Sequence, residues 1–99
     1  MKPQIDQMQW DTLRRSEGEN LIVDFDATPK HLAVIPFEVL EDGLETRDEE
    51  PLASANMNRK PIENAIARAL DEGDWRELVR IDTGQVLFQL WITRSHFVK

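Results

Sequence analysis

Residues 58–74 read NRKPIENAIARALDEGD and predict the helix around which the rest of the fold is organised. Apolar side chains recur there at i, i+3, i+4, i+7 and i+8, which is one stripe along a helix: Ile62, Ala65, Ile66, Ala69 and Leu70. The residues between them predict a polar outer face: Glu63, Asn64, Arg68, Asp71 and Glu72. Asn58 or Lys60 suits the N-terminal cap, Pro61 the first turn, and Gly73 the C-terminal end. Because such a helix is only marginally stable alone in water, its apolar stripe must pack against other elements.

Length and composition indicate one ordinary folded domain. The chain has 99 residues, of which 40% are hydrophobic and 31% charged, and we expect a single domain over residues 1–99 with the polar residues 1–9 frayed. The absence of cysteine excludes disulfides, thiolate nucleophiles and cysteine-bound zinc. No segment approaches about 18 consecutive apolar residues, and the first residues lack a signal-peptide run. We therefore expect a cytoplasmic protein with no membrane contact.

The charge is acidic and concentrated in one segment. Nineteen acidic and twelve basic residues give a net charge of −7, which argues against direct binding of nucleic acid. Residues 38–50, here called the acidic segment, carry −6 of this charge because their only basic residue is Arg47. The acids of the segment are Glu38, Glu41, Asp42, Glu45, Asp48, Glu49 and Glu50.

Three segments have the alternation of β-strands. Residues 21–27 and 31–35 flank a turn at Thr28-Pro29 and predict an antiparallel hairpin. Residues 85–93, QVLFQLWIT, form the strongest strand, with apolar residues on both faces, so we expect it to be central or covered on both sides. Leu90 and its alternate neighbours share one face of this strand, whereas Leu87 and Trp91 share the other.

The remaining segments are less regular. Residues 36–45 predict a short helix opened by Pro36 and weakened or ended near Gly43. Residues 10–19 predict a turn pinned by Trp10 and Leu13, and residues 45–56 a solvated loop. Residues 74–81 fit a second short helix or a strand over 77–81 that turns at 82–84 into the last strand; we favour the hairpin. The fold class is therefore α+β in two layers: a small antiparallel sheet of three to four strands, in chain order β-β-α-α-(β)-β, with two helices on one face.

The same parts resemble a known family. The resemblance is carried by Trp10-Asp11, the hairpin, the motif I-P-x-E-x-L-E-D at 35–42, the motif N-R-x-x-I-E at 58–63 and the final strand from Val86 to Phe97. The chain resembles a family of short, uncharacterised bacterial proteins of about 85–100 residues with a hairpin–helix–helix–strand order. Members often end in Asp-Phe where this chain has His96-Phe97. The resemblance implies a fold and a bacterial, cytosolic context, and no activity.

No motif for catalysis, a metal or a cofactor is present. His31 and His96 have no neighbouring ligands at metal-site spacing, and the serines lie in no nucleophile elbow. Ser95 and His96 are adjacent, but adjacent residues of a strand point to opposite faces. The four glycines are isolated, so no loop cradles phosphate. We predict no catalytic residues, no metal, no cofactor and no enzymatic activity.

Two surfaces are candidates for protein contact. If the helices cover the Phe88 face of the last strand, Leu87 and Trp91 form an apolar spot suited to a protein partner or to a homodimer. The alternative is an acidic inhibitor or nucleic-acid mimic that binds a basic, nucleic-acid-handling protein. Its contact residues would be Glu41, Asp42, Glu45, Asp48, Glu49 and Glu50.

Overall fold

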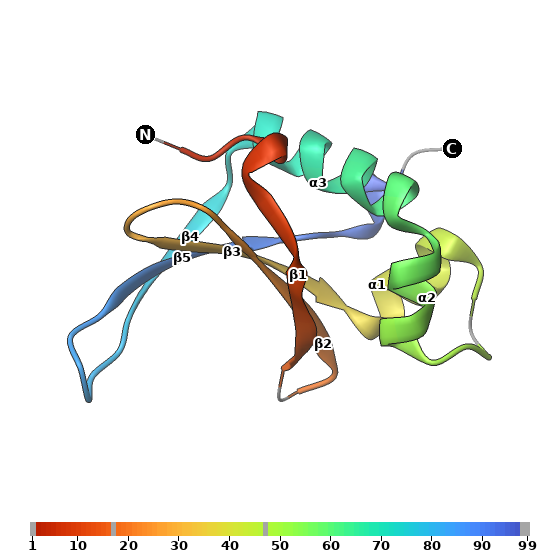
Figure 1. Cartoon of the computed structure of the whole chain (residues 1–99), viewed down its shortest axis with the longest axis horizontal. Helices are drawn as coiled ribbons and strands as arrows, with labels where there is room; N and C mark the ends of the chain where they lie inside the picture. The colour runs from red at the N-terminus through yellow and green to blue at the C-terminus, as the bar shows by residue number, and fades with distance from the viewer. Residues whose placement is uncertain (1, 17, 47, 98–99) are drawn as a thin grey trace.

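The computed structural model describes residues 2–16, 18–46 and 48–97, in which three α-helices pack on a mixed five-stranded sheet (Figure 1). The strands are β1 (Met8–Ser16), β2 (Asn20–Phe25), β3 (Lys30–Pro36), β4 (Trp75–Val79) and β5 (Val86–Trp91). The helices are α1 (Phe37–Leu44), α2 (Pro51–Met57) and α3 (Arg59–Glu72), with short 3-10 turns η1 (Ile5–Gln7) and η2 (Arg94–His96). None of these described helices has the length and apolar character needed to span a bilayer.

The predicted α+β class is confirmed, but the predicted strand number, strand order and helix number are wrong. The sheet has five strands in the order β1-β2-β3-β5-β4, and its β3–β5 pair is parallel whereas the other pairs are antiparallel. The parallel pair arises because the chain leaves β3, crosses through α1, α2 and α3, and returns at β4 and β5. Sequence alternation identifies strands but does not say which strands become neighbours.

Strand β1 replaces the predicted turn at residues 10–19. Its alternation is hidden by an irregularity between Gln9 and Arg14, where the pairing register with β2 shifts. At this point the Asp24 backbone N–H donates to the Thr12 hydroxyl at 2.8 Å instead of to a strand carbonyl. The expected fraying of residues 1–9 stays a prediction; in the structure they contain η1 and the start of β1.

Helix α2 replaces most of the solvated loop predicted at residues 45–56. Pro51 occupies its first turn, and the Glu50 carboxylate caps it by accepting the Ala53 backbone N–H at 2.8 Å. The helix has only seven residues and buries Ser54 and Ala55. A contact surface this small leaves no apolar periodicity in the sequence, so the helix depends on its cap and on packing.

Helix α3 confirms the predicted apolar stripe. Four stripe residues are buried in the core, namely Ile62, Ala65, Ile66 and Ala69. Gly73 ends the helix in the left-handed conformation, at φ 68°, and its N–H bonds the Ala69 carbonyl at 3.0 Å. The stripe packs with alternate residues of three strands and with one residue of each other helix: Leu21, Val23, Phe25, Ala33, Ile35, Leu90, Ile92, Leu40 and Ala55.

The predicted polar outer face of α3 is exposed at Asn64, Arg68, Asp71 and Glu72, and it also holds β1 and η2. The Glu63 carboxylate accepts the indole N–H of Trp10 from β1 at 2.6 Å. Arg68 donates to the His96 carbonyl at 2.8 Å, and Glu72 lies 2.8 Å from Nε2 of the same histidine. These contacts hold β1 and η2 against the helix layer.

The hairpin alternative for residues 74–81 is confirmed. β4 pairs with β5 from Trp75↔Leu90 to Val79↔Val86, and the turn closes through a 2.7 Å bond from the Gly84 N–H to the Arg80 carbonyl. β5 lies between β3 and β4, as its two apolar faces predict. The hairpin projects beyond the helix layer, at the opposite end of the molecule from α1 and α2 (Figure 1).

Gly43 gives the first testable prediction. A Cβ at this position would lie 2.5 Å from the Phe97 ring, so Gly43→Ala should lower the free energy of unfolding by about 1–3 kcal/mol. Helix propensity alone predicts the opposite sign, a gain of about 1 kcal/mol. Urea denaturation of Gly43→Ala in the wild type and in a Phe97→Ala background separates the two effects. Persistence of the cost without the ring would show that Phe97 is not its cause.

Candidate functional site

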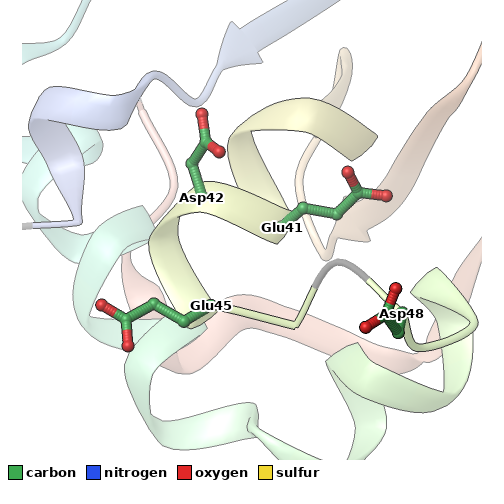
Figure 2. Close-up of a pocket in the computed structure, with 4 residues that line it drawn as sticks. All are labelled: Glu41, Asp42, Glu45 and Asp48. Atoms are coloured by element: carbon green, nitrogen blue, oxygen red, sulfur yellow. The ribbon is translucent and has the colours of Figure 1, made fainter.

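The acidic segment forms a surface hollow of about 490 Å³ lined by four predicted residues: Glu41, Asp42, Glu45 and Asp48. Glu41 and Asp42 lie on α1, Glu45 follows the end of that helix at φ 59°, and Asp48 precedes α2. Figure 2 shows that the four carboxylates point in different directions rather than toward one centre. Among the described residues, no group of three or more acidic or histidine side chains is placed to hold a metal ion.

Several acids of this segment already pair with basic side chains. Arg94 of η2 contacts Asp42 at 2.8 Å and Glu38 at 3.1 Å. Glu50 forms an ion pair with Arg15 of β1 in addition to capping α2, while Glu49 lies exposed beside it. Arg47 lies outside the described residues. The surface of the segment is therefore less negative than its sequence indicates, because Arg94 and Arg15, which lie outside the segment, pair with three of its acids.

The second predicted surface lies on the face of the sheet opposite the helices, here called the open face. Its apolar residues are Ile22, Leu32, Val34, Leu78, Leu87 and Trp91, which follow from the strand registers. Leu32 and Val34 are buried and belong to no helix-packed cluster, since the core uses their alternate neighbours. The open face is therefore a second apolar surface, outside the core cluster on which the described helices pack.

Trp91 lies on the open face, half-buried beside Val34. The guanidinium group of Arg76 lies 5.2 Å from the centre of its ring, and its indole N–H donates to Gln89 at 3.1 Å. A shallow cleft of about 600 Å³ runs from Trp91 toward α1 and η2, with Val39, Arg76 and Arg94 on its walls. Aromatic and arginine side chains together are typical of the central part of protein interfaces.

Leu87 also lies on the open face, directly opposite Leu78 of β4. Like Trp91, it is half-buried rather than fully exposed. The sequence interpretation thus placed both residues on the face away from the helices, where the structure has them. The structure adds Arg76 and Leu78 as their neighbours on β4, which sequence alternation within β5 alone does not reveal.

Sequence reasoning missed the most exposed apolar side chains of the molecule. Leu78, Val79 and Ile81 are 46%, 59% and 101% exposed, and all three belong to the β4 strand and its turn. Met57, at the end of α2, is 80% exposed. The signal for the first three was the series L-V-x-I among charged residues, which marks a strand with little covering. That signal was obscured by the helix alternative for the same residues.

Both histidines serve packing. His31 is 5% exposed, donates through Nδ1 to the Pro29 carbonyl at 2.6 Å, and stacks on Phe88. His96 is 4% exposed and accepts the Thr93 backbone N–H at Nδ1, so its proton lies on Nε2, toward Glu72. The two rings lie in different parts of the fold, each bonded to its own surroundings.

Comparison of the chain with protein-family models, with curated proteins and with solved structures gives no match. The family resemblance described above, with its bacterial and cytosolic context, therefore stays a prediction.

The acidic segment gives a prediction with a matched control. Glu50→Ala removes the cap of α2 and the pair with Arg15, so it should lower the free energy of unfolding by about 1 kcal/mol. Glu49→Ala removes the same charge from the adjacent position and should change stability by less than half as much. Urea denaturation measures both. Equal costs would mean that the cap contributes nothing beyond the charge itself.

Proposed function

We propose that this protein acts by protein–protein contact rather than by catalysis, and that a second copy of the chain binds at its open face. The observation that carries the proposal is the exposure of apolar residues where the open face meets the outermost strand. Leu78 lies on that face beside Leu87; Val79 alternates to the other face of β4, and Ile81 lies in the turn that follows the strand.

Exposed apolar side chains favour association, because burying them in an interface removes them from water. Burying an aliphatic side chain of this size stabilises an interface by up to about 1.5–3 kcal/mol. Edge strands are usually shortened, charged or covered, because an open edge pairs with other chains. β4 has charges at Arg76 and Glu77, but it keeps Leu78 and Val79 beside them. A surface of mixed arginine and apolar residues favours specific association over random aggregation.

Against catalysis, both histidines and two of the serines already form hydrogen bonds within the fold. Both histidines are nearly buried and hydrogen bonded. Ser54 is buried against Thr46 at 3.0 Å, and the Ser95 hydroxyl bonds the Thr93 hydroxyl at 2.8 Å. The four carboxylates around the acidic hollow point in different directions (Figure 2).

The test is the solution mass of variants of exposed residues, measured by light scattering at low and high salt. Wild type should be a dimer at both salt concentrations, because apolar contacts are little affected by ionic screening. Trp91→Ser and the milder Leu78→Ser should give folded monomers, with folding checked by circular dichroism. Met57→Ser, which removes an exposed apolar side chain from α2, is the matched control and should stay dimeric. A dimer that survives both Trp91→Ser and Leu78→Ser would contradict the proposed face.

A second function is supported by the hollow that gathers four acids of the acidic segment. In this alternative, the protein docks a basic, nucleic-acid-handling partner through Glu41, Glu45 and Asp48. Binding of an oligo-arginine peptide, measured calorimetrically, should then weaken at least tenfold from low to physiological salt. The triple variant Glu41→Gln, Glu45→Gln, Asp48→Asn should weaken binding further than neutralisation of three acids elsewhere, at Asp6, Asp11 and Asp26. Equal losses in the two variants would reduce the effect to net charge.

A further inference from the structure

A hollow of about 450 Å³ lies beside the C-terminal end of α3, on the face of the sheet that carries the helices. On this face Trp75 of β4 lies opposite Leu90 of the core, and Glu77 lies opposite Phe88. Alternate residues of one strand, and residues opposite each other in an antiparallel pair, project on the same face. Helix α3 ends at Gly73, and the β4–β5 hairpin projects beyond the helix layer (Figure 1). The volume lies within the range of small-molecule pockets, about 300–1,000 Å³.

Aromatic rings line this cavity, here called the aromatic hollow. The ring of His31 stacks on Phe88 with the centroids 4.8 Å apart, and it meets the ring of Trp75 edge to face at 4.9 Å. Phe88 and Trp75 are half-buried, so part of each side chain is accessible to a ligand. His31 is buried and donates from Nδ1 to the Pro29 carbonyl. In the neutral ring, Nε2 is therefore an acceptor, and it has no partner in the described chain.

Two opposite charges line the aromatic hollow, and only the positive one has a partner. Lys2 donates from Nζ to the Gly73 carbonyl at 3.3 Å, and Gly73 is the C-terminal cap of α3. The C-terminal end of a helix carries partial negative charge, so this end favours an ammonium group. The Glu77 side chain is exposed and forms no hydrogen bond or ion pair within the described chain. Its carboxylate is therefore available to a cation.

We propose that the aromatic hollow binds a small aryl- or alkylamine in its protonated form, with the ammonium group between the Glu77 carboxylate and the rings of Phe88 and Trp75. The negative face of an aromatic ring attracts a cation, and aromatic side chains grouped around a cation are a common means of recognising ammonium ligands. A carboxylate beside the rings adds a charge-assisted hydrogen bond. Nε2 of His31 supplies a further acceptor for an N–H of the amine.

An anionic ligand fits the same hollow poorly. The charged donor available to it is Lys2, which already binds the Gly73 carbonyl. The indole nitrogen of Trp75 is buried and has no hydrogen-bond partner in the described chain, so it is not a donor that a ligand reaches from outside. An anion would also lie beside the Glu77 carboxylate, on a chain whose net charge is −7. Charge therefore selects a cation.

The apolar body of the amine also has a surface to cover. Val79 lies two residues after Glu77 and therefore on the same face of β4, opposite Val86 of β5. Val79 is 59% exposed, and Val86 is half-buried. A ring or alkyl chain attached to the ammonium group would lie along these two valines and remove them from water, which favours binding. The hollow thus fits an amine with an apolar body better than ammonia or a metal cation.

This inference goes beyond self-association and does not depend on it. The aromatic hollow and the open face lie on opposite faces of the sheet, because Glu77 and Leu78 are successive residues of β4. A variant such as Trp91→Ser, which tests the dimer, leaves the residues of the hollow unchanged. Loss of one activity without the other is therefore expected, and failure of either proposal leaves the other standing.

The test compares three ligands with the same phenyl group: 2-phenylethylamine, the neutral 2-phenylethanol and the anionic 3-phenylpropionate. Nuclear magnetic resonance titration of the wild type measures the affinities and locates the contact. The amine should bind at least tenfold more tightly than the alcohol, with shifts of the Trp75 indole N–H and of the Glu77 and Phe88 amides. Equal affinity for amine and alcohol, preference for the anion, or no shifts at these residues would overturn the inference.

Two variants and a matched control test the roles of the charges. Glu77→Gln should weaken binding of the amine at least tenfold while leaving the alcohol unaffected. Asp74→Asn, which removes an exposed negative charge close in sequence but outside the lining of the hollow, should change the affinity much less. Lys2→Ala should tighten binding of the amine by about twofold, because it removes a like charge from the hollow.

The signs of these effects decide the outcome, and circular dichroism checks that each variant is folded. Equal losses in Glu77→Gln and Asp74→Asn would reduce the effect to net charge and overturn the site. Weaker binding of the amine in Lys2→Ala would overturn the assignment of the hollow to a cation.

Discussion

The parallel pairing of β3 with β5 is the interaction on which the rest of the structure depends. It joins the antiparallel unit β1-β2-β3 to the β5–β4 hairpin, through a register from Lys30↔Leu87 to Val34↔Trp91. β3 carries five consecutive buried residues, from His31 to Ile35, because one of its faces packs on the helices and the other on open-face neighbours. Without this pair, Leu90 and Ile92 would leave the core, and α3 would lose part of the surface on which its stripe packs.

Local signals explain what was predictable from the sequence. The spacing of Ile62, Ala65 and Ile66 defines a buried helix face whatever it packs on, and the alternation in residues 21–25 defines a strand. Strand β1 was not predicted, because the irregularity at Thr12 breaks its alternation. Helix α2 was not predicted, because a seven-residue helix depends on the Glu50 cap rather than on an apolar pattern. The parallel pairing of β3 with β5 could not be predicted for a different reason. It joins segments more than fifty residues apart, and no local pattern encodes which strands become neighbours.

The same distinction applies to the candidate surfaces. That Leu87 and Trp91 share a face away from Leu90 follows from alternation and was predictable. The position of Arg76 over Trp91 depends on the β4–β5 register. The exposure of Val79 depends on the position of β4 as the outermost strand of the sheet. Both are consequences of sheet order. The sequence therefore identifies an apolar face, whereas the edge that completes it becomes visible only once the strands are arranged.

The two surfaces differ in what the fold already uses them for, and this favours the apolar one as the site of association. Glu50 caps α2 and pairs with β1, and Asp42 holds η2 through Arg94, so part of the acidic segment stabilises the monomer. A partner that competed for these carboxylates would have to break contacts within the fold. Val79 and Ile81, in contrast, are 59% and 101% exposed, and burying apolar side chains of this kind in an interface is favourable. A partner that bound the exposed apolar residues of β4 would leave these contacts of α1, α2 and η2 in place.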